Sequence, residues 1–222
     1  MIRGSWFVLF VCVLLVGGSL TPSVGDEREV LKRPLDLPAP GQGNDEEDED
    51  APESIVFYGV PYEGDAFFWC LDKSCSMVGS PLETLKQQVT ESINSLSHRA
   101  HIGIVAFSTN VIPWRTYPSR ASAANKSAAN TWIQTLEAAG GTIIAPAGVQ
   151  TLAICHQSPK SKKTVIVVGD GRPADESSAL TNITTANYEP VPINTILIQD
   201  TEGVAFMESL AAQNQGTFLF LP

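Results

Sequence analysis

The chain has 222 residues, of which 43% are hydrophobic and 17% charged, and its formal net charge at pH 7 is −10. The acidity is unevenly placed, because residues 26–53 hold eleven acidic residues against three basic ones, whereas residues 54–222 hold thirteen against ten. Neither segment carries a clustered run of basic residues, which argues against a nucleic-acid-binding protein.

The N-terminal segment combines one basic residue, Arg3, with an apolar run of thirteen residues from Trp6 to Gly18. Such a run is short for a membrane-spanning helix and is typical of a signal peptide. Small residues at positions 23 and 25 flank a candidate cleavage site, so we predict a signal peptide at residues 1–25 and a mature chain that begins near Asp26. The alternative is an uncleaved membrane anchor. We therefore expect a protein that is secreted or exposed in the cell envelope or periplasm, and in contact with a membrane only if this segment is retained.

Residues 26–53 contain several prolines and glycines, followed by six consecutive acidic residues from Asp45 to Asp50. A segment of this composition cannot bury enough apolar surface to offset its chain entropy. We predict a disordered, acidic linker. The remaining residues 54–222 are long enough for one domain with a substantial core.

Six apolar runs rich in β-branched and aromatic residues predict strands, at residues 54–58, 66–71, 102–107, 164–168, 193–198 and 217–221. A shorter strand is predicted at residues 111–114, and Pro113 confines it to a sheet edge. Proline and glycine predict a turn at residues 61–64.

Helical segments alternate with these strands. Apolar residues recur at three- and four-residue steps across residues 81–97, which predicts an amphipathic helix with one stripe facing the core. An alanine-rich helix with Trp132, Ile133 and Leu136 is expected to run toward Gly140-Gly141, where the two glycines end it. Further helices are expected at residues 146–155, 175–186 and 204–214. This alternation indicates the α/β class, with a mostly parallel sheet, helices on both faces and one short antiparallel edge strand.

Oxygen-bearing side chains gather where predicted strands end, in three loops. They are Asp72, Ser74 and Ser76 after the strand at 66–71, Thr142 after Gly140-Gly141, and Asp170 after the strand at 164–168. In an extended Asp-x-Ser-x-Ser segment the first, third and fifth side chains point the same way, so one ion can be reached by all three. An all-oxygen set selects a hard divalent cation, Mg2+ first, with Mn2+ or Ca2+ as substitutes, and argues against zinc or copper.

This pattern resembles the metal-ion-dependent adhesion site of the von Willebrand factor type A (vWA) domain, which has Asp-x-Ser-x-Ser, a distant threonine, and an aspartate in a Thr-Asp-Gly-like turn. The resemblance covers essentially all of residues 54–222. It implies a doubly wound, Rossmann-like sheet whose first and fourth strands are neighbours, which would bring Asp72 and Asp170 together. It also implies a metal with an open coordination position, which an Asp or Glu carboxylate of a partner protein can fill.

Two residues depart from the family pattern. Cys75 stands where glycine is usual between the two serines, and Gly169 stands where threonine is usual before the second aspartate. A side chain at position 75 would weaken the site if the loop needed a conformation open only to glycine there. After export three cysteines remain, at positions 70, 75 and 155, so the options are one disulfide with a free thiol, or three free thiols.

Three functions follow from these residues. The leading hypothesis is a secreted or envelope-exposed vWA domain that binds a protein ligand through a Mg2+-bridged carboxylate, with Lys73 and Arg172 either steering an acidic partner or simply solvated. The alternative is a structural or regulatory interaction module that does not use the metal site. An enzyme is disfavoured, because no phosphate-binding glycine loop is present, Ser74 occupies the place of a second acid, and no histidine is linked by motif to Cys75.

Overall fold

The structure is a computed structural model that describes residues 52–222. The predicted signal peptide and the linker up to residue 51 lie outside the described residues. Within the described part, no helix combines the length and the apolar character needed to cross a membrane.

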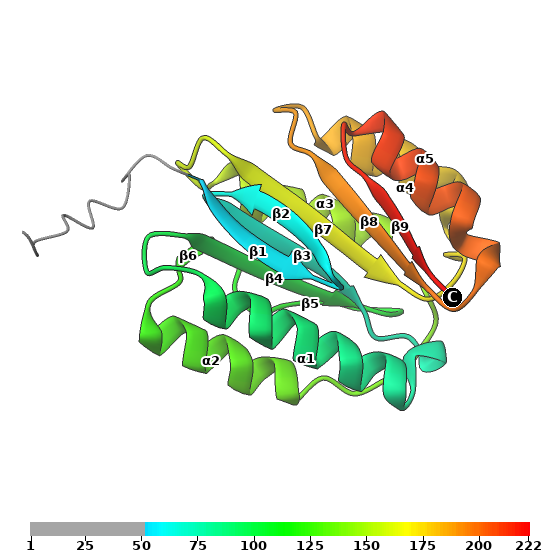
Figure 1. Ribbon diagram of the computed structural model, residues 1–222. Helices are drawn as coiled ribbons and strands as arrows, with labels where there is room; N and C mark the ends of the chain where they lie inside the picture. Colours follow the sequence, from blue (N-terminus) through cyan, green and yellow to red (C-terminus); the bar gives the residue numbers. More distant parts are fainter. Residues whose placement is uncertain (1–51) are drawn as a thin grey trace, which may run out of the picture. The chain divides into compact units, whose positions relative to one another are not determined.

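A seven-stranded sheet forms the centre of the domain, with the strand order β5-β4-β3-β7-β8-β9 (Figure 1). Five strands are parallel: β3 (Ala66–Asp72), β4 (His101–Phe107), β7 (Lys163–Gly169), β8 (Ile193–Ile198) and β9 (Phe218–Leu221). The short strands β5 (Val111–Pro113) and β6 (Ser119–Arg120) pair antiparallel with β4. The α/β class, the mostly parallel sheet and the antiparallel edge strand are confirmed, whereas β6 has only two residues and was not predicted.

The direction in which successive strands are added to the sheet reverses at β3. The chain passes from β3 to β4 on one side and later returns to β7 on the other side, so β3 lies between them. All seven residues of β3 are buried, which explains why its sequence is a continuous apolar run ending in Asp72. Ligands of doubly wound sheets bind at the carboxyl ends of the strands at such a switch point.

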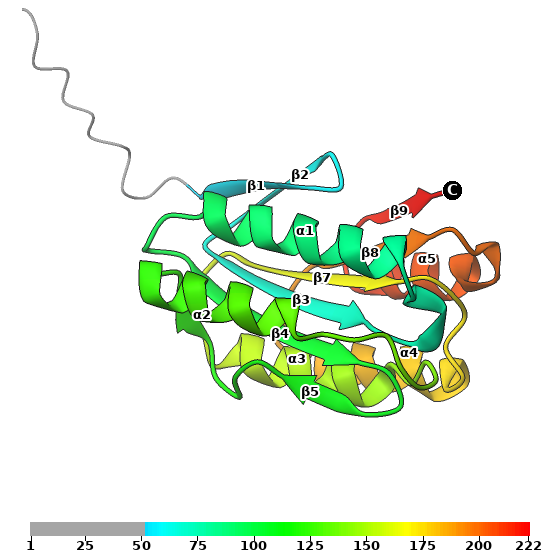
Figure 2. The same cartoon turned by 90° about the horizontal axis from the view of Figure 1, so that it is seen from below.

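Helices cover both faces of the sheet (Figure 2). One face packs against α1 (Ser80–Ser95) and α2 (Ala123–Gln134), and the other against α3 (Ala145–His156), α4 (Glu176–Ala186) and α5 (Val204–Gln213). In α1 the apolar stripe predicted from the sequence is buried, as at Leu85 and Val89, which are 1% and 0% exposed. Each face therefore has its own apolar core.

Helix α2 ends earlier than the sequence suggested. It stops at Gln134, before Leu136 and well before the glycine pair. The backbone N–H of Thr135 bonds the Trp132 carbonyl at 3.0 Å, and the Thr135 hydroxyl donates to the same carbonyl at 2.7 Å. This tight turn takes up a carbonyl that a continuing helix would need. Gly140-Gly141 consequently lies in a loop.

A separate hairpin packs on the α1 face. It consists of β1 (Glu53–Phe57) and β2 (Val60–Gly64), paired antiparallel. The turn expected at residues 61–64 is wrong, because those residues form β2. The turn lies instead at Tyr58 and Gly59, whose φ angles are 49° and 76°, as two-residue hairpin turns require. Pro61 is tolerated because β2 is an edge strand in a two-stranded sheet.

Candidate metal centre

Two aspartates meet at the carboxyl edge of the sheet. Asp72 is the last residue of β3, and Asp170 directly follows β7, the parallel neighbour of β3. Both side chains are withdrawn from solvent, since Asp72 is 1% exposed and Asp170 is 5% exposed. Buried carboxylates at this position require a compensating charge or several hydrogen bonds.

The hydrogen bonding of Asp72 is incomplete. Its Oδ1 accepts the backbone N–H of Ser74 at 2.7 Å, which turns the chain sharply after β3. Its Oδ2 is buried and has no hydrogen-bond partner among the described residues. An orphaned buried carboxylate oxygen is costly, and such a group calls for an explanation such as a bound ion or water.

Two serine hydroxyls connect the two strand ends. The Oγ atoms of Ser74 and Ser76 lie 3.0 Å apart, and Ser76 Oγ donates to Asp170 Oδ1 at 2.8 Å. The Ser76–Asp170 bond joins residues 94 positions apart in the chain. Ser74 is buried and Ser76 is exposed. Four of the five expected oxygen ligands therefore form one connected group.

Thr142 lies in the loop between α2 and α3, next to this group. Gly140 in that loop has a φ of 84°, and its carbonyl accepts the backbone N–H of Cys75 at 3.0 Å. The carbonyl of Thr142 accepts the backbone N–H of Ala174 at 2.8 Å. The loop thus contacts both aspartate-bearing segments. Among the described residues, the Thr142 hydroxyl makes no hydrogen bond to the other four.

Asp175 fixes the same loop and was missed at the sequence level. Its two carboxylate oxygens accept the backbone N–H groups of Ile144 and Ala145 at 3.0 and 2.8 Å, at the start of α3. A carboxylate is favourable at a helix N-terminus. The sequence showed Asp175 only as the start of its own helix, and nothing local indicated that it holds a helix that begins thirty residues earlier.

Cys75 fits the loop without strain. It begins the short 3-10 helix η1 (Cys75–Met77), and its side chain is exposed. The non-glycine residues with positive φ in residues 52–222 are Tyr58, Gln199 and Gln215, so position 75 does not adopt a backbone conformation that favours glycine. The other two cysteines, 70 and 155, are buried, and all three thiols are free.

Gly169 leaves space beside Asp72. A Cβ atom built at this position would lie 3.3 Å from Asp72 Oδ2 and 3.0 Å from Met207 Cε. Both contacts are tighter than ordinary van der Waals separation, so a larger residue would press on the orphaned oxygen. The glycine that replaces the usual threonine therefore keeps the surroundings of that oxygen open.

Burial raises the pKa of the Asp72 carboxyl from 3.8 to about 7, and the neighbouring charge of Asp170 adds to the effect. Burial also raises the pKa of Asp170, against the lowering effect of its hydrogen bond from Ser76. Two desolvated carboxyls side by side hold their negative charge poorly. The site is chemically suited to a cation, which would stabilise both anionic forms.

Comparison with known proteins assigns the family. The sequence model of the von Willebrand factor type A domain matches residues 69–220, so the chain belongs to the vWA domain family.

Individual relatives are more distant. Inter-alpha-trypsin inhibitor heavy chain H4 of Homo sapiens is 28% identical over 157 residues, which cover 66% of this chain and 17% of that protein. The chain therefore spans about a sixth of the length of this relative. Among solved structures, a von Willebrand factor type A protein from Catenulispora acidiphila has a TM-score of 0.67 at 19% identity, covering 78% of this chain and 45% of the other. The pilus adhesin SpaC from Lactobacillus rhamnosus GG has a TM-score of 0.60 at 14% identity, covering 69% and 27%. At these identities the structural matches show the fold alone.

Proposed function

We propose that this vWA domain is a protein-interaction module that binds a carboxylate of a partner protein through a divalent cation. The cation, Mg2+ first, with Mn2+ or Ca2+ as substitutes, would be held by Asp72, Ser74, Ser76, Thr142 and Asp170. The observation that carries this proposal is the orphaned Oδ2 of Asp72, a buried carboxylate oxygen with no hydrogen-bond partner among the described residues, at the carboxyl end of the switch-point strand β3.

The donor set suits a hard cation. The group contains carboxylate and hydroxyl oxygens, the ligands that Mg2+ and Ca2+ prefer. In residues 52–222, no cluster of three or more His, Cys, Asp or Glu side chains could hold a metal. The hydroxyls of the serines are therefore needed to complete the site, and their mutual hydrogen bond keeps them in position without an added charge.

Charge balance favours an acidic ligand. A divalent cation beside two ionised aspartates leaves no surplus negative charge, because the remaining donors are neutral. An Asp or Glu side chain from another protein can then bind without strong repulsion. The chain's own residues supply the orientation: Ser76 holds Asp170, and the backbone of Ser74 holds Asp72.

We propose that the protein works outside the cytoplasm, either secreted or in the cell envelope. The sequence of residues 1–25, with one basic residue and a short apolar run, supports this location. N-terminal sequencing of the protein recovered from its native source tests the proposal. A mature N-terminus near Asp26 is expected, whereas an intact Met1 on membrane-free protein would contradict it.

Metal binding is tested by thermal unfolding of the full chain with Mg2+ or with EDTA. The expected result is a higher Tm with Mg2+, and loss of this gain in Asp72→Ala. A matched control is Asp65→Ala, because Asp65 precedes the opposite end of β3 and its carboxylate accepts bonds from Ser161 and Lys162 instead. The control should keep the Mg2+ effect. An equal Tm with and without Mg2+ in the natural sequence would refute the proposal that the domain binds a cation.

A second candidate is an interaction module that does not use the cation. It is favoured by the exposed apolar residue Val56, which is 62% exposed on the outer side of the hairpin. A partner that docks there would be captured equally well with Mg2+ and with EDTA. Val56→Lys would abolish such capture, and Asp72→Ala would leave it unchanged.

A further inference from the structure

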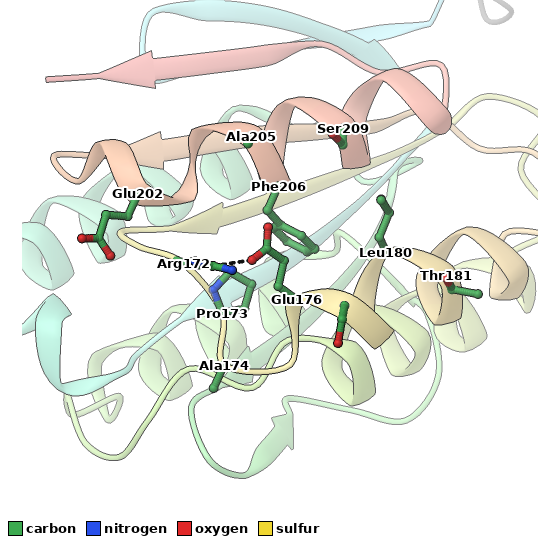
Figure 3. A pocket seen from close by; sticks show the side chains of 11 residues that line it. Arg172, Pro173, Ala174, Glu176, Leu180, Thr181, Glu202, Ala205, Phe206 and Ser209 are labelled. Carbon is green, nitrogen blue, oxygen red and sulfur yellow. Dashed lines mark hydrogen bonds and ion pairs between the residues drawn. The ribbon is translucent and has the colours of Figure 1, made fainter.

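A groove runs between α4 and α5, on the face of the sheet opposite to α1. Its volume is about 800 Å3, and it is open to solvent along one side. Figure 3 shows the two helices forming its walls, with the segment after β7 closing one end. A volume of this size is typical of ligand-binding clefts. Neither the metal centre nor the core packing accounts for the groove.

The walls of the groove provide an apolar patch. Leu180 on α4 and Phe206 on α5 face each other across it (Figure 3). Phe206 is 2% exposed, so its ring is held rigidly in the core beneath the groove. Ala205 and Ser209 are small residues on the α5 side and leave the space above the ring open. The patch can accept one apolar side chain at reduced entropic cost, because the ring of Phe206 is already fixed by the core.

The rim of the groove is acidic. Arg172 donates to Glu176 in an ion pair, so the positive charge of Arg172 is already compensated. Glu202 lies in the short 3-10 helix η2 (Thr201–Gly203), which directly precedes α5. It is exposed and has no ion-pair partner among the described residues. Asp200, also exposed, lies two residues before it and accepts the Glu202 backbone N–H at 2.8 Å. The uncompensated charge at this end of the groove is therefore negative.

The groove begins beside the metal centre. Arg172, which lines it, follows Asp170 by two residues, so their Cα atoms are separated by no more than about 7.6 Å. An extended peptide advances about 3.3 Å per residue. A carboxylate placed at the cation and an apolar side chain placed in the groove would then be a few residues apart on one peptide.

We propose that the groove binds a segment of the partner protein that carries three features in a short stretch: a carboxylate for the cation, an apolar side chain for the space between Leu180 and Phe206, and a basic side chain for Glu202. The proposal rests on the cation-dependent function and assigns its specificity. A purely acidic segment fits poorly, because Asp200 and Glu202 would repel the charges that follow the anchoring carboxylate.

The test uses a displayed library of random short peptides, panned against the full chain with Mg2+. Enriched peptides are expected to contain Asp or Glu, a large aliphatic or aromatic residue a few positions away, and Lys or Arg beyond it. Binding of one enriched peptide is then measured by fluorescence anisotropy. Ala205→Trp, which fills the groove from an exposed position on α5, should weaken binding by about tenfold or more. Its matched control, Ala212→Trp on the same helix outside the groove, should stay near the natural affinity.

The charge feature has its own test. Glu202→Lys should lower the affinity for the same peptide. A second peptide, in which Glu replaces the basic residue, should bind this variant with restored affinity. Glu208→Lys, an exposed position on α5 that does not line the groove, is the control and should show neither effect.

Failure of this proposal can be told apart from failure of the metal centre. If no peptides are enriched, or if enriched peptides lack the apolar and basic positions, or if Ala205→Trp binds as well as its control, the groove is not the specificity site. The Mg2+-dependent gain in Tm would persist in all of these cases. If that gain is absent and binding survives EDTA, the cation-dependent function itself is wrong.

Discussion

Replacing Asp72 with asparagine should stabilise the metal-free protein while it destroys metal binding. In the folded chain the carboxyl is 1% exposed, and its pKa rises from 3.8 to about 7. At about 1.36 kcal/mol per pKa unit, the buried charge costs about 4 kcal/mol above pH 7. Asparagine has the same shape and keeps the oxygen that accepts the Ser74 N–H. Its new NH2 group is unpartnered, which costs about 1–3 kcal/mol.

The net gain for Asp72→Asn is therefore about 1–3 kcal/mol, or roughly 2–10 °C in Tm for a domain of this size. The gain depends on pH. Because the folded-state pKa is raised, the folded chain binds more protons than the unfolded chain between pH 3.8 and about 7, so stability falls as pH rises through this window. The advantage of the variant should be complete above about pH 7 and shrink toward pH 4.

Thermal unfolding followed by circular dichroism, in EDTA and across this pH range, measures the effect. Added Mg2+ should then raise the Tm of the natural sequence and leave the Tm of Asp72→Asn unchanged. The Tm advantage of Asp72→Asn should therefore shrink or change sign. The isosteric control is Asp65→Asn at the other end of β3. If Asp72→Asn melts at or below the natural sequence in EDTA above pH 7, the buried charge is not the source of strain that we infer.

Two substitutions and one labelling experiment test the surroundings of the site. Gly169→Thr should crowd the Asp72 carboxylate and lower the free energy of unfolding by about 1–3 kcal/mol, as measured by urea unfolding. An unchanged midpoint would show that Asp72 and Met207 make room for the new side chain. Asp175→Ala removes two hydrogen bonds from the start of α3 and should cost about 1–2 kcal/mol, together with a weaker Mg2+ effect in titration calorimetry. In the mature folded protein, Cys75 should react with a thiol reagent at once, and the two buried cysteines only after unfolding; rapid reaction of all three would contradict their burial.

The sequence predicted the parallel strands well because each is a short apolar run buried on both faces, as in β3. Short runs of this kind, rich in β-branched and aromatic residues, are typical of buried strands. It predicted α1 from a regular apolar spacing. It missed β2, because Pro61 and Gly64 are turn residues in most contexts, and here the real turn uses a positive φ at Tyr58. The sequence also extended α2 too far. The Thr135 hydroxyl donates to the Trp132 carbonyl and so competes with the backbone N–H that would continue the helix, and residue spacing does not show this bond.

For the candidate site too, the sequence predicted the local features and missed those that depend on contacts between distant residues. The oxygen-bearing residues were recognisable by their types and by their positions after strands. The geometry around them was not, because it depends on contacts between distant loops. Asp175 holds the start of α3, and the Gly140 carbonyl holds Cys75, and neither contact leaves a trace in the neighbouring sequence. The effect of Cys75 could be judged only from the backbone conformation at that position.

The hydrogen bond between Ser76 and Asp170 joins segments 94 residues apart, and it has a consequence for how the chain matures. Pairing of β3 with β7 closes a long loop, a step that is slow compared with forming local helices. A partly folded chain with only β3 and α1 in place has three of the five candidate ligands and lacks the second aspartate. On the proposed function, cation binding would require this long-range pairing, so competence to bind a partner would be a late event in folding.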